Sequence, residues 1–309
     1  MRSPGLSSLL ERVAALEAEA RRPSDWLALA DLYSQTETCD PLDHRLPANR
    51  GNALWLADCP QEALHAYWRA AQLAPSDPVV LRGLGNVQLD LNAFELAEQA
   101  YARSMQLDPA ALTAWNRSQV LIGLERYPEG YAQAEERWRI PSHRPWRELA
   151  AGGVTTLDQL QEPLLVWSEQ GLGDSIQMLR YVDILRQQGH QLQLAVQESL
   201  HTIVSSSGID AAPISPEGLG HHHEDSWLPM FSLPDLLGVT PENPVASAPY
   251  LHCPDELVEE WGAILHAERR PIIAINWQGN PVAEQTGQVG RSFELQLLAP
   301  LVSGFEGSF

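Results

Sequence analysis

The sequence predicts a chain of two unlike halves: repeated helical hairpins come first, and an α/β part with an open parallel sheet follows. Small, aromatic and proline positions in the first half recur at a spacing of 34 residues. Near residue 163 the composition changes to apolar runs bounded by Gly and Pro, and a Gly-rich turn joins one such run to a helical pattern. The length of 309 residues fits about two domains.

The repeat is carried by positions that have a mechanical role in a helical hairpin. Small residues let the two helices approach, tyrosines fill the space toward the next hairpin, and a proline ends the second helix because it cannot donate to the preceding turn. The pairs related by 34 positions are Gly51 and Gly85, Ala63 and Ala97, Tyr67 and Tyr101, Ala70 and Ser104, and Pro75 and Pro109.

This pattern resembles the signature of tetratricopeptide repeats, which falls here on Leu81, Leu84, Gly85, Ala97, Tyr101 and Pro109. Trp115 opens a third repeat, which departs from the pattern at Tyr131 and is expected to be a capping hairpin. We expect repeats over residues 44–140, in which most of the named residues pack hairpin against hairpin. The resemblance implies a concave groove that binds a protein or peptide partner.

Residues 1–43 predict N-terminal helices in a degenerate repeat. The stretch SDWLALADLY, at 24–33, has the pattern of a first helix, with Ser24 or Asp25 as its N-cap. The segment after it is polar and broken by prolines, so it does not complete a standard hairpin.

Charge and cysteine content exclude several classes of partner and site. A formal charge of −20 argues against nucleic acid or an anionic membrane, because both require a basic surface. Cys39, Cys59 and Cys253 are widely spaced and indicate neither a disulfide framework nor a zinc site. The N-terminal segment lacks the unbroken apolar core of a signal peptide, and no stretch approaches the ~20 apolar residues of a transmembrane helix. We expect a cytoplasmic protein.

The junction at 141–162 follows an aromatic and Arg-rich segment, which suggests a packed connection. Its EGYxxxExRW element, at 129–138, resembles one found in bacterial proteins that fuse these repeats to a glycosyltransferase-like domain.

The second half opens with a predicted parallel βαβ unit. A strand is expected at 164–169, a Gly-rich turn follows, and a helix that ends at Gly189 leads to a second strand at 191–196. Ligands of such sheets lie beyond the carboxyl ends of the strands, where Gly171, Gly173 and Asp174 fall. Ile176 replaces the third glycine of a dinucleotide fingerprint, which argues against a dinucleotide-dependent oxidoreductase. The alternative is that the glycines only allow a tight turn.

The segment EQGLGDSIQMLRY, at 169–181, resembles the opening βα motif of those glycosyltransferase-like proteins, and its Gly173–Asp174 pair resembles the start of heptosyltransferases. The resemblance implies a Rossmann-like acceptor domain of the GT-B type over 163–255. Asp174 is then the candidate general base that deprotonates the acceptor hydroxyl, with Glu169 as the backup. The alternative for Asp174 is a capping role at the start of the helix.

A second stretch, DxxLPMxSLP, also resembles the acceptor domain and selects Asp225, Ser232 and Leu233. The neighbouring cluster 221–225 holds three histidines and two acids. Adjacent histidines on a loop point in different directions, so no metal site is expected.

Residues 256–309 are expected to hold an interdomain helix and the start of a second Rossmann-like domain. An apolar strand is predicted at 271–281 and a helix from Phe293. The resemblance places donor phosphates there, near Asn276, Gln278, Asn280, Arg291 and Ser292. An arginine fork and a helix N-terminus suit a diphosphate, although a plain surface arginine fits as well. A complete domain needs on the order of 100 residues, so the donor half is expected to be incomplete in this chain.

Two functions follow from this sequence. One is a glycosyltransferase-like protein that moves a sugar from a nucleotide-sugar donor to a protein or glycan acceptor presented by the repeats, without a separate cofactor and incomplete as this chain stands. The alternative is a non-catalytic interaction protein whose repeats bind a partner peptide.

Overall fold

The computed structural model describes residues 4–140, 162–210, 212–215, 226–245, 249–276, 292–303 and 305–308. The chain divides into two compact units, Met1–Val120 with Glu268–Phe309, and Leu121–Ala267. Among the described helices, none is long and apolar enough to cross a membrane.

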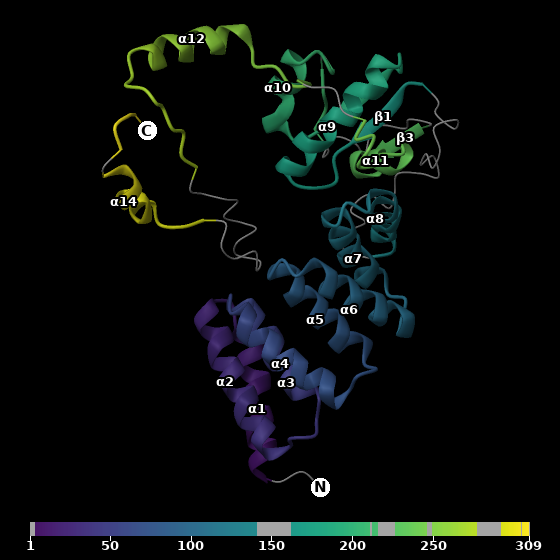
Figure 1. Ribbon diagram of the computed structural model, residues 1–309, viewed down its shortest axis with the longest axis vertical. Coiled ribbons are helices and arrows are strands. Elements are labelled where there is room, and N and C mark those ends of the chain that lie inside the picture. Colours follow the sequence, from purple (N-terminus) through teal and green to yellow (C-terminus); the bar gives the residue numbers. More distant parts are fainter. Residues whose placement is uncertain are drawn as a thin grey trace. The chain divides into compact units, whose positions relative to one another are not determined.

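The N-terminal part of the first unit is built from consecutive antiparallel helices, and each helix from α1 to α5 packs on the next along the chain (Figure 1). The predicted hairpins are confirmed as α3 with α4 and α5 with α6. Proline occupies the first turn of α2, α4 and α5, where its missing N–H has no intrahelical partner to lose. The helices are α1 (Pro4–Glu19), α2 (Pro23–Cys39), α3 (Arg45–Leu56), α4 (Pro60–Leu73), α5 (Pro78–Asp90), α6 (Phe94–Leu107) and α7 (Ala111–Gly123).

A ladder of three buried tyrosines holds the hairpins together. Tyr33, Tyr67 and Tyr101 are 34 residues apart, and each lies on the second helix of its hairpin. Each hydroxyl donates to the first helix of the same hairpin; Tyr101 reaches Asn86 at 2.7 Å. A Cβ added to Gly85 would lie 2.7 Å from the ring of Tyr101, which explains the small residue at that position.

The ladder corrects the prediction for the N-terminal segment. Tyr33 shares the place of Tyr67, so α2 is the second helix of a hairpin and α1 is the first. Leu29 and Thr36 of α2 are buried at the positions of Ala63 and Ala70. The W-x-x-L-A-x-x-Y pattern of 24–33 therefore belongs to a second helix, because it is the tyrosine that fixes the register.

The second unit carries the predicted parallel βαβ motif, which is confirmed for β1, α9 and β2. Its three strands have the order β2-β1-β3, all parallel, and Val166 of β1 pairs with Leu194 and with Leu228. Gly189 ends the helix region with a φ of +94°, which only glycine adopts readily. The main elements are α8 (Tyr127–Ala134), β1 (Leu164–Trp167), α9 (Leu172–Gln187), β2 (Leu192–Ala195), α10 (His201–Ser206), β3 (Ser226–Pro229), α11 (Leu233–Leu236) and α12 (Asp255–His266).

Short 3-10 helices complete this unit: η1 (Glu135–Arg139) after α8, η4 (Glu198–Leu200) before α10, and η6 (Met230–Ser232) between β3 and α11. Tyr131 of α8 is buried in the core formed by β1, α9 and β3. The third repeat departs from the 34-residue pattern here because its second helix packs against the α/β core instead of a further hairpin.

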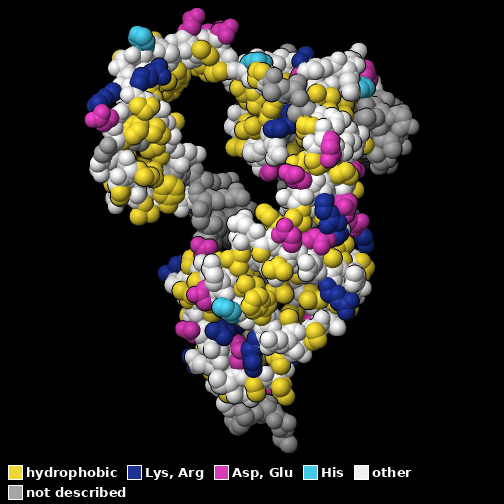
Figure 2. All heavy atoms as spheres, in the orientation of Figure 1, with side chains coloured by type: hydrophobic (Ala, Val, Ile, Leu, Met, Phe, Trp, Pro, Cys, Tyr) yellow, Lys and Arg dark blue, Asp and Glu magenta, His cyan; other side chains and the backbone are white. Residues whose placement is uncertain are grey.

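The helix α12 lies where the interdomain helix was predicted, and none of its residues is buried. Its acidic side chains lie on one side and its apolar ones on the other (Figure 2). The strand predicted at 271–281 is not formed over its described residues: Ile272 makes only an isolated bridge to Ser308. A strand requires a neighbour for its backbone groups, which an apolar sequence alone does not supply. In place of a helix from Phe293, η7 (Leu295–Leu298) leads into α14 (Ala299–Val302).

Candidate functional site

The carboxyl end of β1 opens onto a small cavity that brings the two predicted catalytic acids together. Glu169 and Asp174 both line it, and Met230 and Phe231 close it from the segment after β3. This is the edge of a parallel sheet where ligands bind. The cavity volume is about 10 Å³, which is room for roughly one water molecule.

Asp174 lies in the first turn of α9 and caps it. Its Oδ2 accepts a hydrogen bond from the backbone N–H of Gly171 at 3.1 Å, and a carboxylate at this place also stabilises the positive end of the helix. Gly171 is the N-cap residue of α9, whereas a Cβ at Gly173 would meet nothing within 4 Å. The capping interpretation of Asp174 thus has a geometric basis.

Glu169 is a buried carboxyl, with its side chain 4% exposed, and it pairs with a guanidinium from another segment. Nη2 of Arg137 donates to its Oε1 at 2.9 Å. Burial raises the pKa of Glu169 to about 7, although the attraction of Arg137 acts in the opposite direction. This carboxyl titrates near neutral pH, which is the range useful to a general base.

Arg137 joins three segments of the second unit. Its side chain is 1% exposed, and besides Glu169 it donates to Ser232 Oγ at 2.8 Å and to Glu135 Oε1 at 2.6 Å. Its guanidinium also lies over the ring of Trp138, 4.3 Å from the centroid. Ser232 in turn donates to Glu135 at 2.8 Å, so the predicted acceptor-loop serine is part of this network. We call Arg137, Glu169, Ser232 and Glu135 the arginine network.

Arg137 was not predicted as a site residue, although a signal for it exists in the sequence. Glu135, Arg137 and Trp138 are three of the six fixed positions of the EGYxxxExRW element. An arginine among aromatic residues is usually read as a surface group, because its burial depends on partners far away in the chain.

The remaining predicted residues belong to the other unit or lie outside the described residues. Asn276 is exposed and Ser292 is half-buried, and both belong to the other unit. Within the described ranges, no group of three or more His, Cys, Asp or Glu residues could hold a metal ion. Several predicted residues lie outside the described residues: His221, His222, His223, Glu224, Asp225, Gln278, Asn280 and Arg291.

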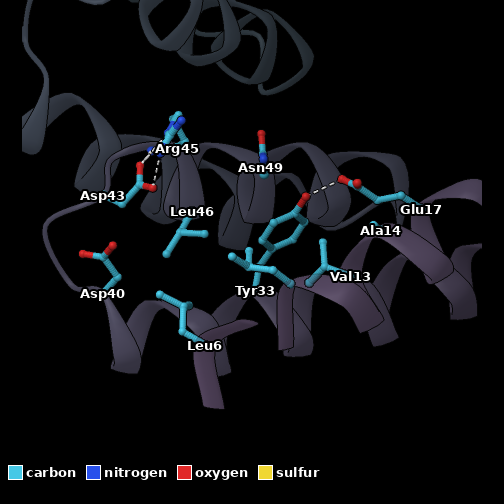
Figure 3. A pocket seen from close by; sticks show the side chains of 11 residues that line it. Leu6, Val13, Ala14, Glu17, Tyr33, Asp40, Asp43, Arg45, Leu46 and Asn49 are labelled. Atoms are coloured by element: carbon cyan, nitrogen blue, oxygen red, sulfur yellow. Dashed lines mark hydrogen bonds and ion pairs between the residues drawn. The ribbon is translucent and has the colours of Figure 1, made fainter. Parts of the chain in front are cut away.

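A larger cavity opens in the first unit, between α1, α3 and the segment that precedes α3 (Figure 3). Its volume is about 270 Å³. Leu6, Val13 and Leu46 form its buried apolar wall, and Tyr33 reaches it from α2. α1 and α3 are the first helices of neighbouring hairpins, so the cavity lies on the surface that successive first helices share. We call it the α1–α3 cavity.

Polar side chains stand at both ends of the α1–α3 cavity. At one end, Arg45 donates two hydrogen bonds of 2.8 and 2.6 Å to Asp43, and Asp40 lies next to this pair (Figure 3). At the other end, the hydroxyl of Tyr33 donates to Glu17. Burial, and then the hydrogen bond to Glu17, raises the pKa of Tyr33 well above its usual value, so this hydroxyl remains a donor.

Solved structures of tetratricopeptide-repeat proteins are similar to part of the chain. They include the Sgt2 domain from Aspergillus fumigatus (17% identity, 40% of this chain and 82% of that one, TM-score 0.37). Others are the first such domain of Spaghetti (RPAP3) bound to the HSP90 peptide SRMEEVD (20%, 40% and 98%, 0.37) and YrrB, described as having an unusual peptide-binding site (14%, 44% and 68%, 0.38). No protein-family model and no curated protein matches the chain.

At these identities and TM-scores the likeness transfers no ligand and no activity to this chain. The architecture is mostly helical, with tetratricopeptide-like hairpins and a small three-stranded parallel sheet.

Proposed function

We propose that this chain is a non-catalytic interaction protein that binds a partner peptide through its helical hairpins. The observation that carries the proposal is the α1–α3 cavity, an apolar recess of about 270 Å³ with polar groups at its ends. Binding sites combine an apolar lining with a few placed polar groups in this way, although sites for whole small ligands are usually larger, roughly 300–1,000 Å³. The volume suits one or two side chains of a longer ligand.

The stacked hairpins supply the surface beyond the cavity. Each repeat contacts only its neighbours, so successive first helices present a continuous face on which a segment of another protein can lie. Asn52 on α3 is exposed, and its Oδ1 accepts from Tyr67. The amide nitrogen of such a residue can donate to the backbone of an extended peptide.

The test fills the cavity without changing the fold. Ala14 lines the cavity and is exposed on α1, whereas its neighbour Ala15 is exposed but does not line it. Peptides selected from a random displayed library on the full chain should bind Ala14→Trp at least ~10-fold more weakly, a loss of about 1.4 kcal/mol. Ala15→Trp should bind them like the wild type. If the library yields no peptide, or if both variants bind equally well, the proposal fails.

A second candidate function is glycosyl transfer, and one observation favours it. Glu169, with a pKa near 7, and Asp174 line one cavity at the ligand-binding edge of a parallel sheet. In this proposal Asp174 is the base with Glu169 as the backup, and the acceptor-loop residues are Gly171, Gly173, Asp225 and Ser232. The residues that bind the donor phosphates are Asn276, Gln278, Asn280, Arg291 and Ser292.

The geometry weighs against this second candidate in the observed state. A cavity of about 10 Å³ holds no sugar, and the Glu169 carboxylate is engaged by Arg137. Calorimetry with UDP-, GDP- and ADP-sugars tests it directly. Heat of binding together with sugar transfer would support the enzyme. If none of the nucleotide sugars gives heat of binding, peptide binding is the better account.

A further inference from the structure

The α1–α3 cavity is apolar in the middle and anionic at its ends. Its wall of Leu6, Val13 and Leu46 is buried, and Leu10 and Ala14 continue it toward solvent. Three carboxylates line the cavity, those of Glu17, Asp40 and Asp43, against the single guanidinium of Arg45. Figure 3 shows Asp40 and Asp43 at one end and Glu17 at the other, with the apolar side chains between them.

Among the described lining residues, Arg45 is the one cation. Two of its five N–H donors bond Asp43 in a bidentate pair, so its charge is already compensated within the lining. Asp40 differs from Asp43: among the described residues, no hydrogen bond and no ion pair within 4.0 Å engages its carboxylate. Tyr33 donates to one oxygen of Glu17, which leaves the second oxygen able to accept. Two carboxylates with unused acceptors thus flank an apolar recess.

We infer that the α1–α3 cavity takes a cationic amphipathic peptide segment, in which one apolar side chain fills the recess and an Arg or Lys on either side meets Asp40 and Glu17. The inference rests on the proposed peptide-binding function and adds the chemistry of the ligand. A cationic ligand complements the carboxylates of the cavity. Acidic peptides and nucleic acids would place like charges together, which disfavours their binding.

The length of α1 sets the spacing of the ligand. Leu6 and Glu17 are eleven residues apart on this helix, a rise of about 16 Å at 1.5 Å per residue. An extended peptide covers that distance in about five residues. Asp40 lies beyond Leu6 at its end of the cavity (Figure 3), so the two basic residues should stand at least about five positions apart, with the apolar residue between them.

The experiment selects a displayed random peptide library on the full chain and then measures individual peptides by fluorescence anisotropy. Selected peptides should share the basic–apolar–basic pattern. Glu17→Gln/Asp40→Asn should weaken them about 10-fold, and raising NaCl from about 0.05 to 0.5 M should also weaken them, because exposed charges are screened. Glutamine keeps an acceptor for Tyr33, so the fold is preserved.

The matched control removes the same charge from the same region. Glu11 on α1 and Asp31 on α2 are exposed and do not line the cavity. Glu11→Gln/Asp31→Asn should leave the affinity within about twofold of the wild type, the scale of a screened surface charge. An equal loss in both double variants would show a general field effect and overturn the assigned contacts.

A covalent readout locates the ligand. The sequence contains no lysine, so a carbodiimide that couples carboxyls to amines should join the lysine of a selected peptide to this chain. Mass spectrometry is expected to find the new amide at Glu17 or Asp40. Attachment only at Glu11, Asp31 or other remote acids would overturn the inference.

The outcomes separate the inference from the function on which it rests. The selected peptides could lose affinity for Ala14→Trp and yet lack basic residues, or they could bind the Glu17→Gln/Asp40→Asn variant as tightly as the wild type. Either outcome would overturn the cationic ligand and leave the peptide-binding function intact. Tighter binding of the acidic peptide SRMEEVD than of the selected basic ones would do the same. If no peptide is enriched on the wild-type chain, the proposed function itself fails.

Discussion

The repeated hairpins and the α/β unit bury their polar groups in different ways. In the hairpins, each buried tyrosine ends on a neutral or exposed acceptor one helix away, and the arrangement recurs every 34 residues. In the α/β unit, a fully buried arginine pairs with a buried glutamate and connects segments that are 32 and 95 residues distant. Repetition distributes stability over many similar contacts, whereas the arginine network concentrates it in one place.

The largest effect is therefore expected from breaking the arginine network. Arg137→Met should destabilise the second unit by about 3 kcal/mol at pH 8, because it leaves Glu169 buried without its counter-charge. The cost should shrink at pH 5, where Glu169 is protonated. Hydrogen exchange of the β1 amides measures the effect within this unit. Equal destabilisation at both pH values would mean that lost packing, and not the unpaired carboxylate, is responsible.

The second prediction concerns the pH dependence of the α/β unit. Folding raises the pKa of Glu169 from 4.5 to about 7, so between these values the folded state binds more protons than the unfolded state. The free energy of unfolding should then fall as the pH rises from about 4.5 to 7, by about 3 kcal/mol in total at 1.36 kcal/mol per unit of pKa.

Glu169→Gln should remove most of this slope, whereas the hairpins should show none from this source. Amide exchange in β1 and in α5, followed across the same pH range, compares the two units in one experiment. A slope that survives in the variant would assign it to another group.

These two predictions depend on the pairing of Arg137 with Glu169, which is hard to identify from the sequence. Most of the fold, by contrast, is predictable from the sequence. The 34-residue spacing predicts α3 to α6, and the strand–turn–helix pattern predicts β1, α9 and β2, because both are local periodicities. The first hairpin was assigned in the wrong phase because Glu17 stands where later repeats have glycine, which hides α1 as a first helix.

The site was less predictable because its parts are joined only by folding. Glu169 and Asp174 are five residues apart and could be placed at one strand end, but the burial of Arg137 depends on Ser232 and on η1. The α1–α3 cavity, likewise, forms between helices whose facing residues show no sequence relation. The strand predicted at 271–281 is likewise not formed over its described residues, 271–276, since a local apolar run does not specify a partner.

A third prediction sharpens the contrast through glycine. In Gly85→Ala the new methyl group would lie 2.7 Å from the buried ring of Tyr101, so overpacking should outweigh the gain in helix propensity and cost a net ~1–2 kcal/mol. Gly173→Ala, in the first turn of α9, meets no atom within 4 Å and should be neutral or stabilising by up to ~1 kcal/mol. Chemical denaturation of both variants checks the signs. A loss in Gly173→Ala would indicate that this turn needs glycine for a ligand or for a motion.

The smallest expected effect distinguishes the two interpretations of Asp174. As a helix cap, it stabilises α9 by its bond to Gly171 and by its charge at the helix N-terminus. Asp174→Asn keeps an acceptor but loses the charge, so the free energy of unfolding should fall by only about 0.5 kcal/mol, and less in high salt. If Asp174 is a general base, the same change should reduce sugar transfer by ~100-fold or more.

Denaturation at low and high salt, together with turnover on the nucleotide-sugar panel, measures both quantities on one variant. A salt-sensitive loss of stability with no transfer in either protein assigns Asp174 to capping, whereas unchanged stability with lost transfer assigns it to catalysis and makes the α/β unit an active one.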